Sequence, residues 1–138
     1  MVSGPLEESD DRVAQHPSSA AWTKFATDDR GAVVTGRVVD YHGRRTVAYF
    51  RTGMESAAAA DAELQISTAD DLAVWVNGRF ESFVSRQDAA WFDFSSNKAH
   101  APRRVPLTLN AGRNEIVLRV RGGVYASGGF FARIVRPS

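Results

Sequence analysis

Apolar and polar residues alternate along much of the chain with a period of two. The alternation runs through the segments 63–67, 72–77, 104–109, 115–121 and 130–135. Because successive side chains of a β-strand point to opposite faces of the sheet, this period is typical of strands that bury one face. Two earlier strands are expected near 32–40 and 45–52. The pattern predicts an all-β protein built from many short strands.

Turn residues separate these segments. Asn77-Gly78 stands between two strand segments, and both residue types tolerate a positive φ, so a type I′ hairpin is predicted. The loop 110–114 joins two further segments, with Gly112 at the expected left-handed position. Only 54–63 looks helical, and because its alanine run is short and uncapped we expect a single turn or a loop there. Strands of this kind with little helix indicate a sandwich or a barrel.

The N-terminal residues have a different character. Residues 1–21 are polar and acidic, and Pro5 and Pro17 interrupt them, so we expect a flexible arm or linker with one short helical turn near 11–15. Trp22 marks the start of the domain proper, 22–138. A signal peptide has a basic region followed by an apolar one, and the first residues of this chain lack that pattern. Two locations are therefore expected. The chain is cytoplasmic, or it is a segment of a longer secreted protein and is then extracellular or periplasmic.

Composition excludes several classes of protein. The chain has 138 residues, 17 Lys+Arg against 16 Asp+Glu, and 43% hydrophobic residues, which is typical of one soluble domain that can bury a core. No apolar run reaches 18 residues, so no membrane interaction is expected. Without cysteine there are no disulfides and no thiolate chemistry. Arginine pairs at 44–45 and 103–104 suggest an anionic partner, but the interleaved acids favour solvated strand faces over nucleic-acid binding.

Few residues are arranged for catalysis or metal binding. The three histidines, at 16, 42 and 100, are isolated in sequence and are interpreted as loop residues. No Gly-x-Ser-x-Gly elbow is present. Asp70 and Asp71 precede a strand, where acids usually close a turn, and calcium coordination is the weaker alternative. We therefore expect no enzyme activity and, apart from this calcium alternative, no cofactor.

The aromatic residues offer the remaining candidates for binding. Trp75 stands among valines in a strand segment and is expected in the core, and Trp22 is expected to anchor the N-terminal segment to the sandwich. Trp91 and Tyr125 stand in polar or glycine-flanked surroundings. They could present flat rings on which sugars stack their apolar faces.

A set of motifs resembles a known family. An acid pair at 70–71 precedes a strand that ends in Val74-Trp75-Val76-Asn77-Gly78, and Leu109-Asn110-Ala111-Gly112-Arg113-Asn114 turns a later hairpin before Gly129-Phe130. This order resembles the galactose-binding-domain-like modules over roughly 22–135. The resemblance implies an antiparallel jelly-roll β-sandwich. It also implies an accessory module of the kind found in bacterial secreted glycan-active enzymes.

The leading prediction is a non-catalytic module that binds carbohydrate for a larger enzyme. Ligands of the family sit on loops at one end of the sandwich or on a concave face, which points to Trp91, Asp93, Arg86, Asn97 and Tyr125. Sugars would stack on the Trp91 or Tyr125 ring, while Arg86 and Asp93 would hydrogen-bond to hydroxyls.

The alternative is a structural or docking module with no sugar ligand. Its partner would be a neighbouring domain of a longer chain. Its mark would be an exposed apolar patch of Phe80, Phe83, Phe92 and Phe94, larger than a monomer normally leaves uncovered.

Overall fold

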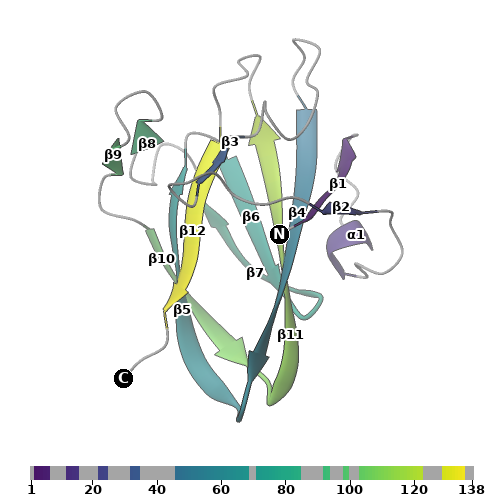
Figure 1. Ribbon diagram of the computed structural model, residues 1–138, viewed down its shortest axis with the longest axis vertical. Coiled ribbons are helices and arrows are strands. Elements are labelled where there is room, and N and C mark those ends of the chain that lie inside the picture. The colour runs from purple at the N-terminus through teal and green to yellow at the C-terminus, as the bar shows by residue number, and fades with distance from the viewer. Residues whose placement is uncertain are drawn as a thin grey trace.

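The computed structural model describes residues 2–6, 12–15, 22–24, 32–34, 46–68, 71–84, 92–93, 98–99, 103–122 and 129–135. The elements in these ranges are shown in Figure 1. They are β1 (Val2–Leu6), α1 (Arg12–Gln15), β2 (Thr23–Lys24), β3 (Ala32–Val34), β4 (Thr46–Ser56), β5 (Ala60–Thr68), β6 (Asp71–Val76), β7 (Arg79–Val84), β8 (Phe92–Asp93), β9 (Lys98–Ala99), β10 (Arg103–Leu109), β11 (Gly112–Gly122) and β12 (Gly129–Val135).

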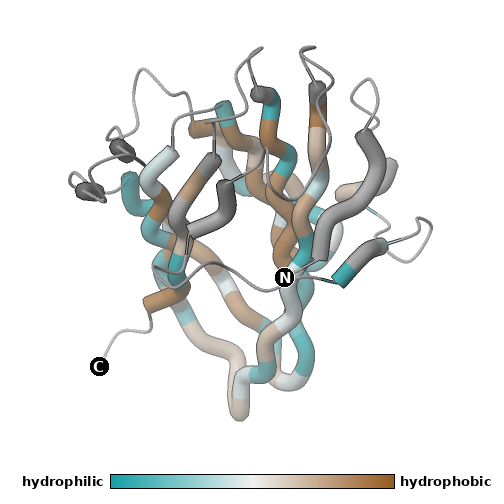
Figure 2. The backbone as a smooth tube through the Cα atoms, turned by 45° about the horizontal axis from the view of Figure 1, so that its top comes forward, coloured by the Kyte–Doolittle hydropathy of each residue, from teal (hydrophilic) through white to brown (hydrophobic). Residues whose placement is uncertain are grey.

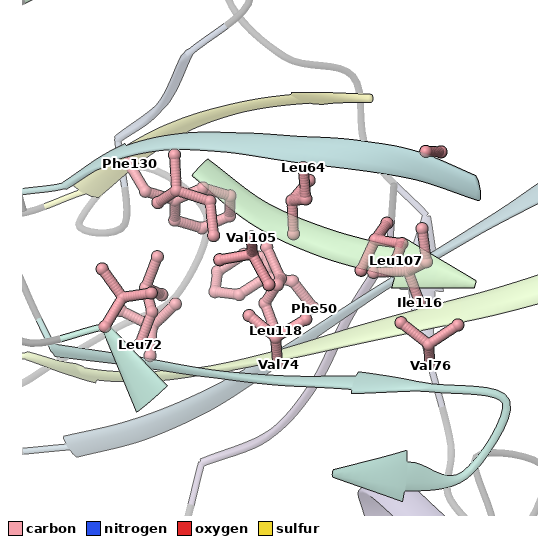
Figure 3. Close-up of a cluster of buried hydrophobic side chains, with 14 of the residues drawn as sticks. Phe50, Leu64, Leu72, Val74, Val76, Val105, Leu107, Ile116, Leu118 and Phe130 are labelled. Carbon is pink, nitrogen blue, oxygen red and sulfur yellow. The ribbon is translucent and has the colours of Figure 1, made fainter. Parts of the chain in front are cut away.

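The strands form two main antiparallel sheets. One sheet has six strands in the order β2-β1-β4-β11-β6-β7, and the other has four in the order β10-β5-β12-β3. β8 and β9 pair separately. The two sheets lie face to face, as Figures 1 and 3 show. The all-β sandwich predicted from the alternating pattern is thus confirmed. Among the described residues, no helix is long and apolar enough to cross a membrane.

The core lies between the sheets. Alternate residues of each strand enter it, so Phe50 and Leu118 from one sheet meet Leu64 and Val105 from the other (Figure 3). Phe50 and Phe130 pack edge to face across the layers, with ring centroids 5.1 Å apart. Each such large side chain contributes about 1.5–3 kcal/mol when it leaves water. Figure 2 shows the corresponding alternation of hydrophobic and hydrophilic residues along the strands.

The predicted turns have the expected backbone geometry. Asn77 has a φ of 52° and Gly78 a φ of 81°, as a type I′ hairpin requires. Gly112 has a φ of 90°, which confirms its left-handed position. A Cβ added at Gly78 would lie 2.6 Å from the backbone oxygen of Gln15, so this turn also needs glycine because α1 passes so close to it.

The alanine-rich segment 54–63 differs in part from the expected turn or loop. A turn occupies only 57–59, while Met54 belongs to β4 and Glu63 to β5. The long neighbouring strands explain this difference. Met54 pairs with Asn114, and Ala60 pairs with Leu109, so ladder hydrogen bonds hold these residues extended despite their weak strand propensity.

The described part of residues 1–21 lies on the sandwich, which differs from the flexible arm expected there. Val2–Leu6 forms β1 and pairs with β4. The short helix predicted near 11–15 is present as α1, and its Ala14 is fully buried. Figure 1 shows β1, β2 and α1 together beside β4. Apolar residues on the outside of the six-stranded sheet provide the surface that this segment covers.

Candidate functional site

The five predicted sugar-binding residues fall largely outside the described part of the chain. Arg86, Trp91, Asn97 and Tyr125 lie outside it, and of Asp93 only the backbone is described, as the last residue of β8. Asp93 pairs with Lys98 of β9, the residue that follows Asn97 in sequence. That the five side chains lie close together therefore stays a prediction.

The predicted calcium residues are only half described. Asp70 lies outside the described residues, and Asp71 begins β6 with a partly exposed side chain. His16, His42 and His100 also lie outside them. Within the described ranges, no three His, Asp or Glu side chains come together in a group that could hold a metal ion. Calcium binding stays a prediction.

The surface of the six-stranded sheet that faces away from the core, here called the outer face, carries a second apolar cluster. The cluster consists of Ala14, Val47, Tyr49, Ala73, Trp75 and Val117, with Trp22 packed against it. Trp75 is only 3% exposed, which confirms its predicted burial. Trp75 nevertheless lies on the outer face and not in the main core, and it packs in one cluster with Ala14 of α1 and with Trp22. The predicted anchoring role of Trp22 is confirmed by the same contacts.

The outer face also carries two exposed phenylalanines. Phe80 and Phe83 of β7 are 55% and 51% exposed, whereas the neighbouring apolar residues are buried. Both belong to the apolar patch predicted for a docking module. Of the other two patch residues, Phe94 and the side chain of Phe92 lie outside the described residues. The described patch is therefore a pair of phenylalanines on β7, the last strand in the sheet order.

Arginines lie against the tryptophans of this face. The guanidinium of Arg119 sits 5.3 Å from the centroid of the Trp75 ring, and that of Arg51 sits 5.6 Å from Trp22. Such cation–π contacts attract a guanidinium to the face of an aromatic ring. The alternating pattern gave no sign of these aromatic partners.

A three-residue ion cluster lies at the hairpin end of the outer face. Arg51 donates two hydrogen bonds to the Glu115 carboxylate, at 2.8 and 3.0 Å, and Arg113 donates a third at 3.1 Å. The hydrogen bond from Arg51 is the main cause that lowers the pKa of Glu115 below its ordinary value. The same bond raises the pKa of Arg51. Glu115 is thus held as a carboxylate and is poorly suited to act as a general acid.

Two asparagines join the two hairpins. The Asn77 side chain accepts a hydrogen bond from the Glu115 amide at 2.9 Å and donates one to the Asn114 oxygen at 2.9 Å. Asn114 is fully buried and also bonds both backbone polar groups of Asn110. Sequence reasoning took both loops as independent turns. The link was missed because its partners are 37 residues apart.

The outside of the four-stranded sheet is polar. Arg133 donates to the Gln65 side chain at 3.0 Å, and Gln65 donates to Glu63 at 3.0 Å. Arg104 lies 3.7 Å from Glu63. Arg104 and Arg133 are exposed, as expected for a solvated strand face.

Comparison with known proteins gives matches in structure only. No family model and no curated protein matches the chain. Two crystal structures of a β-glucosidase from Kluyveromyces marxianus match 99% of this chain. The selenomethionine-labelled form matches with a TM-score of 0.62 and 12% identity, and the glucose complex with 0.63 and 14%. This chain spans only 16% of the length of either β-glucosidase chain.

A family 35 carbohydrate-binding module from an environmental isolate also matches. It covers 84% of this chain and 90% of its own, with a TM-score of 0.43 and 17% identity. The β-glucosidase matches are 12% and 14% identical to this chain, and at such identities a likeness shows the fold alone.

Proposed function

We propose that this chain is a non-catalytic accessory module that binds carbohydrate for a larger secreted enzyme. The observation that carries the proposal is the fold, which is shared with a part of β-glucosidase chains, one of them crystallised with glucose, and which makes sugar the ligand class of choice. The exposed Phe80 and Phe83 rings mean that the described surface also offers aromatic rings to a ligand.

Binding requires no bond to be formed or broken. A sugar places its apolar C–H face on an aromatic ring, and polar side chains at the edge hydrogen-bond to its hydroxyls. In this proposal Trp91 and Tyr125 supply rings, and Arg86, Asp93 and Asn97 supply the polar groups. No cofactor takes part.

Affinity electrophoresis through gels that contain soluble glycans tests the proposal. We expect at least one glycan to retard the protein, and Trp91→Ala to reduce the retardation about tenfold. Arg86→Ala and Arg104→Ala form a matched pair, because Arg104 is an exposed arginine of β10 on the outside of the four-stranded sheet that has no part in the proposed site. Arg86→Ala should weaken the retardation by the glycan, and Arg104→Ala should leave it unchanged. A wild-type protein that no glycan retards would contradict the proposal.

Addition of EDTA shows separately whether Asp70 and Asp71 hold calcium.

A second candidate is a docking module without a sugar ligand, which the same exposed phenylalanines favour. It predicts that no glycan binds. It also predicts that light scattering detects association of the wild-type chain at high concentration, which Phe80→Ser with Phe83→Ser abolishes.

A further inference from the structure

Phe80 and Phe83 share one face of β7 because the strand contains an extra residue. Residues three apart in a regular strand point to opposite faces. Here Val74 pairs with Ser82 and Trp75 with Phe80, so Glu81 is the extra residue of a β-bulge. A bulge reverses the alternation and re-aims the side chains beyond it. Both rings therefore emerge on the outer face, beside Trp75 and Ala73.

The Phe80 ring is held in place from below. It packs edge to face on Trp75, with centroids 5.5 Å apart and planes inclined by 73°. Trp75 is in turn fixed by Arg119 on its ring and by the apolar cluster around it. An exposed ring on a rigid support loses little conformational freedom when a ligand stacks on it.

Hydrogen-bonding groups lie level with Phe83 and one step beyond it, whereas Trp75 and Val117 lie level with Phe80. The register places Ala73 between Phe83 and Arg119, and it pairs Asp71 with Arg121 one step further along the sheet. Asp71, Arg119 and Arg121 alternate with the inward-facing residues of their strands, so they share the outer face with the phenylalanines. The surface thus has an aromatic strip on β7 and a charged strip on β6 and β11 that begins level with Phe83.

The spacing of the rings suits a chain of sugars. Phe80 and Phe83 pair with Trp75 and Ala73, which are two residues apart on β6, so the two rings lie about 7 Å apart along the strand. Two rings at this distance can contact neighbouring pyranoses of one glycan chain, while the charged strip faces hydroxyls at the Phe83 end. A single sugar can cover only one of the rings.

We propose that the β7 strip is a binding site for extended oligosaccharides, in which pyranose rings stack on Phe80 and Phe83 and hydroxyls hydrogen-bond to Asp71, Arg119 and Arg121. The inference rests on the proposed function in taking carbohydrate as the ligand. It assigns a site distinct from the five residues predicted from the sequence. A ribbon-shaped ligand with apolar faces and polar edges matches a surface that carries both aromatic rings and charged groups, whereas a purely apolar partner would use only the rings.

Isothermal titration calorimetry with monosaccharides, disaccharides and longer β-linked glucose, xylose and mannose oligosaccharides tests this site. We expect affinity to rise with chain length. Phe80→Ala and Phe83→Ala should each weaken binding of the longer oligosaccharides about threefold to tenfold, and together more than tenfold. Arg133→Ala, on the opposite sheet, is the matched control and should leave the affinity unchanged. Circular dichroism checks that the variants fold, as expected for substitutions of exposed residues.

A second measurement locates the ligand directly. Ring-proton resonances of Phe80 and Phe83, assigned by comparing the single variants, should shift on titration with the best oligosaccharide. Unchanged affinity and unshifted resonances in a protein that binds glycans would overturn the site and leave the proposed function standing, especially when Trp91→Ala abolishes binding. A wild-type chain that binds no glycan would overturn both. Association of that chain that depends on Phe80 would then assign the strip to protein docking.

Discussion

The outer surfaces of the two sheets follow the same alternation but carry different residues. On the six-stranded sheet the outward positions hold Tyr49, Trp75 and Val117, which form an apolar cluster. On the four-stranded sheet they hold Glu63, Gln65 and charged arginines, which bond to one another. One face therefore needs a cover and the other does not.

This difference explains the position of the N-terminal segment. α1 and Trp22 lie on the apolar face and bury Ala14 against it, whereas nothing in the described chain is packed in this way on the polar face. The cover ends before β7, where Phe80 and Phe83 remain exposed. The uncovered part of an otherwise covered apolar face is where a ligand or partner has most to gain from burial.

The largest expected effect follows from removal of the central aromatic residue of the covered face. Trp75→Ala should lower the free energy of unfolding by about 3–5 kcal/mol, because it empties a buried site. Gln65→Ala, on the polar face, should cost about 1 kcal/mol or less. Urea denaturation followed by circular dichroism compares them. Equal costs would show that the two faces do not differ in the way described.

The next effect concerns the link between the hairpins. Asn114→Ala should cost about 2–3 kcal/mol, since it leaves the side chain of Asn77 and the backbone of Asn110 without partners. Asn114→Asp keeps the acceptor but places a carboxylate oxygen against the Asn110 and Gly112 carbonyl oxygens in a buried site, so it should cost at least as much at pH 7 and less at pH 3, where a protonated carboxyl can donate. The same urea titration at both pH values measures both variants. A cost for Asn114→Asp that grew on acidification would argue against the assigned hydrogen bonds.

Substitutions of the two left-handed glycines distinguish the cost of backbone strain from the cost of a clash with the N-terminal segment. Gly112→Ala meets no atom within 4 Å and should cost about 1 kcal/mol through its positive φ alone. Gly78→Ala adds a clash with the Gln15 oxygen and should cost about 2 kcal/mol or more. Thermal unfolding of both variants provides the measurement. If the costs were equal, α1 would not press on the turn in solution.

The smallest effect is electrostatic and depends on pH. Arg51 holds the pKa of Glu115 below the ordinary glutamate value of 4.5, so the stabilisation is present above about pH 4.5 and is lost as the pH falls through the lower folded value. Because the pair is partly exposed, Glu115→Gln should cost only about 0.5–1 kcal/mol at pH 7 and less at pH 3. Arg104→Ala should cost about 0.5 kcal/mol or less. Urea titrations at both pH values decide, and a cost for Glu115→Gln that grew on acidification would contradict the assignment.

Local patterns predicted the elements that depend on neighbours in sequence. The strand period, the Asn77-Gly78 hairpin and the left-handed Gly112 could all be inferred, since side-chain alternation and φ preferences are properties of a few consecutive residues. The candidate sugar residues were inferred in the same way and stay a prediction, because their side chains lie outside the described residues. The β7 bulge escaped prediction because nothing in the residues 79–84 shows which one is extra.

The sequence by itself determined that the chain forms a two-sided β-sandwich, because its period of two lets each strand bury one face and leave the other outside. Only the tertiary structure decided which outer face is covered. Ala14, Trp22, Trp75 and Val117 are far apart in the chain, and the energy of burying them together exists only after the sheet has assembled. The same holds for the pairing of Arg51 with Glu115, which β4 and β11 bring within hydrogen-bond reach from 64 residues apart.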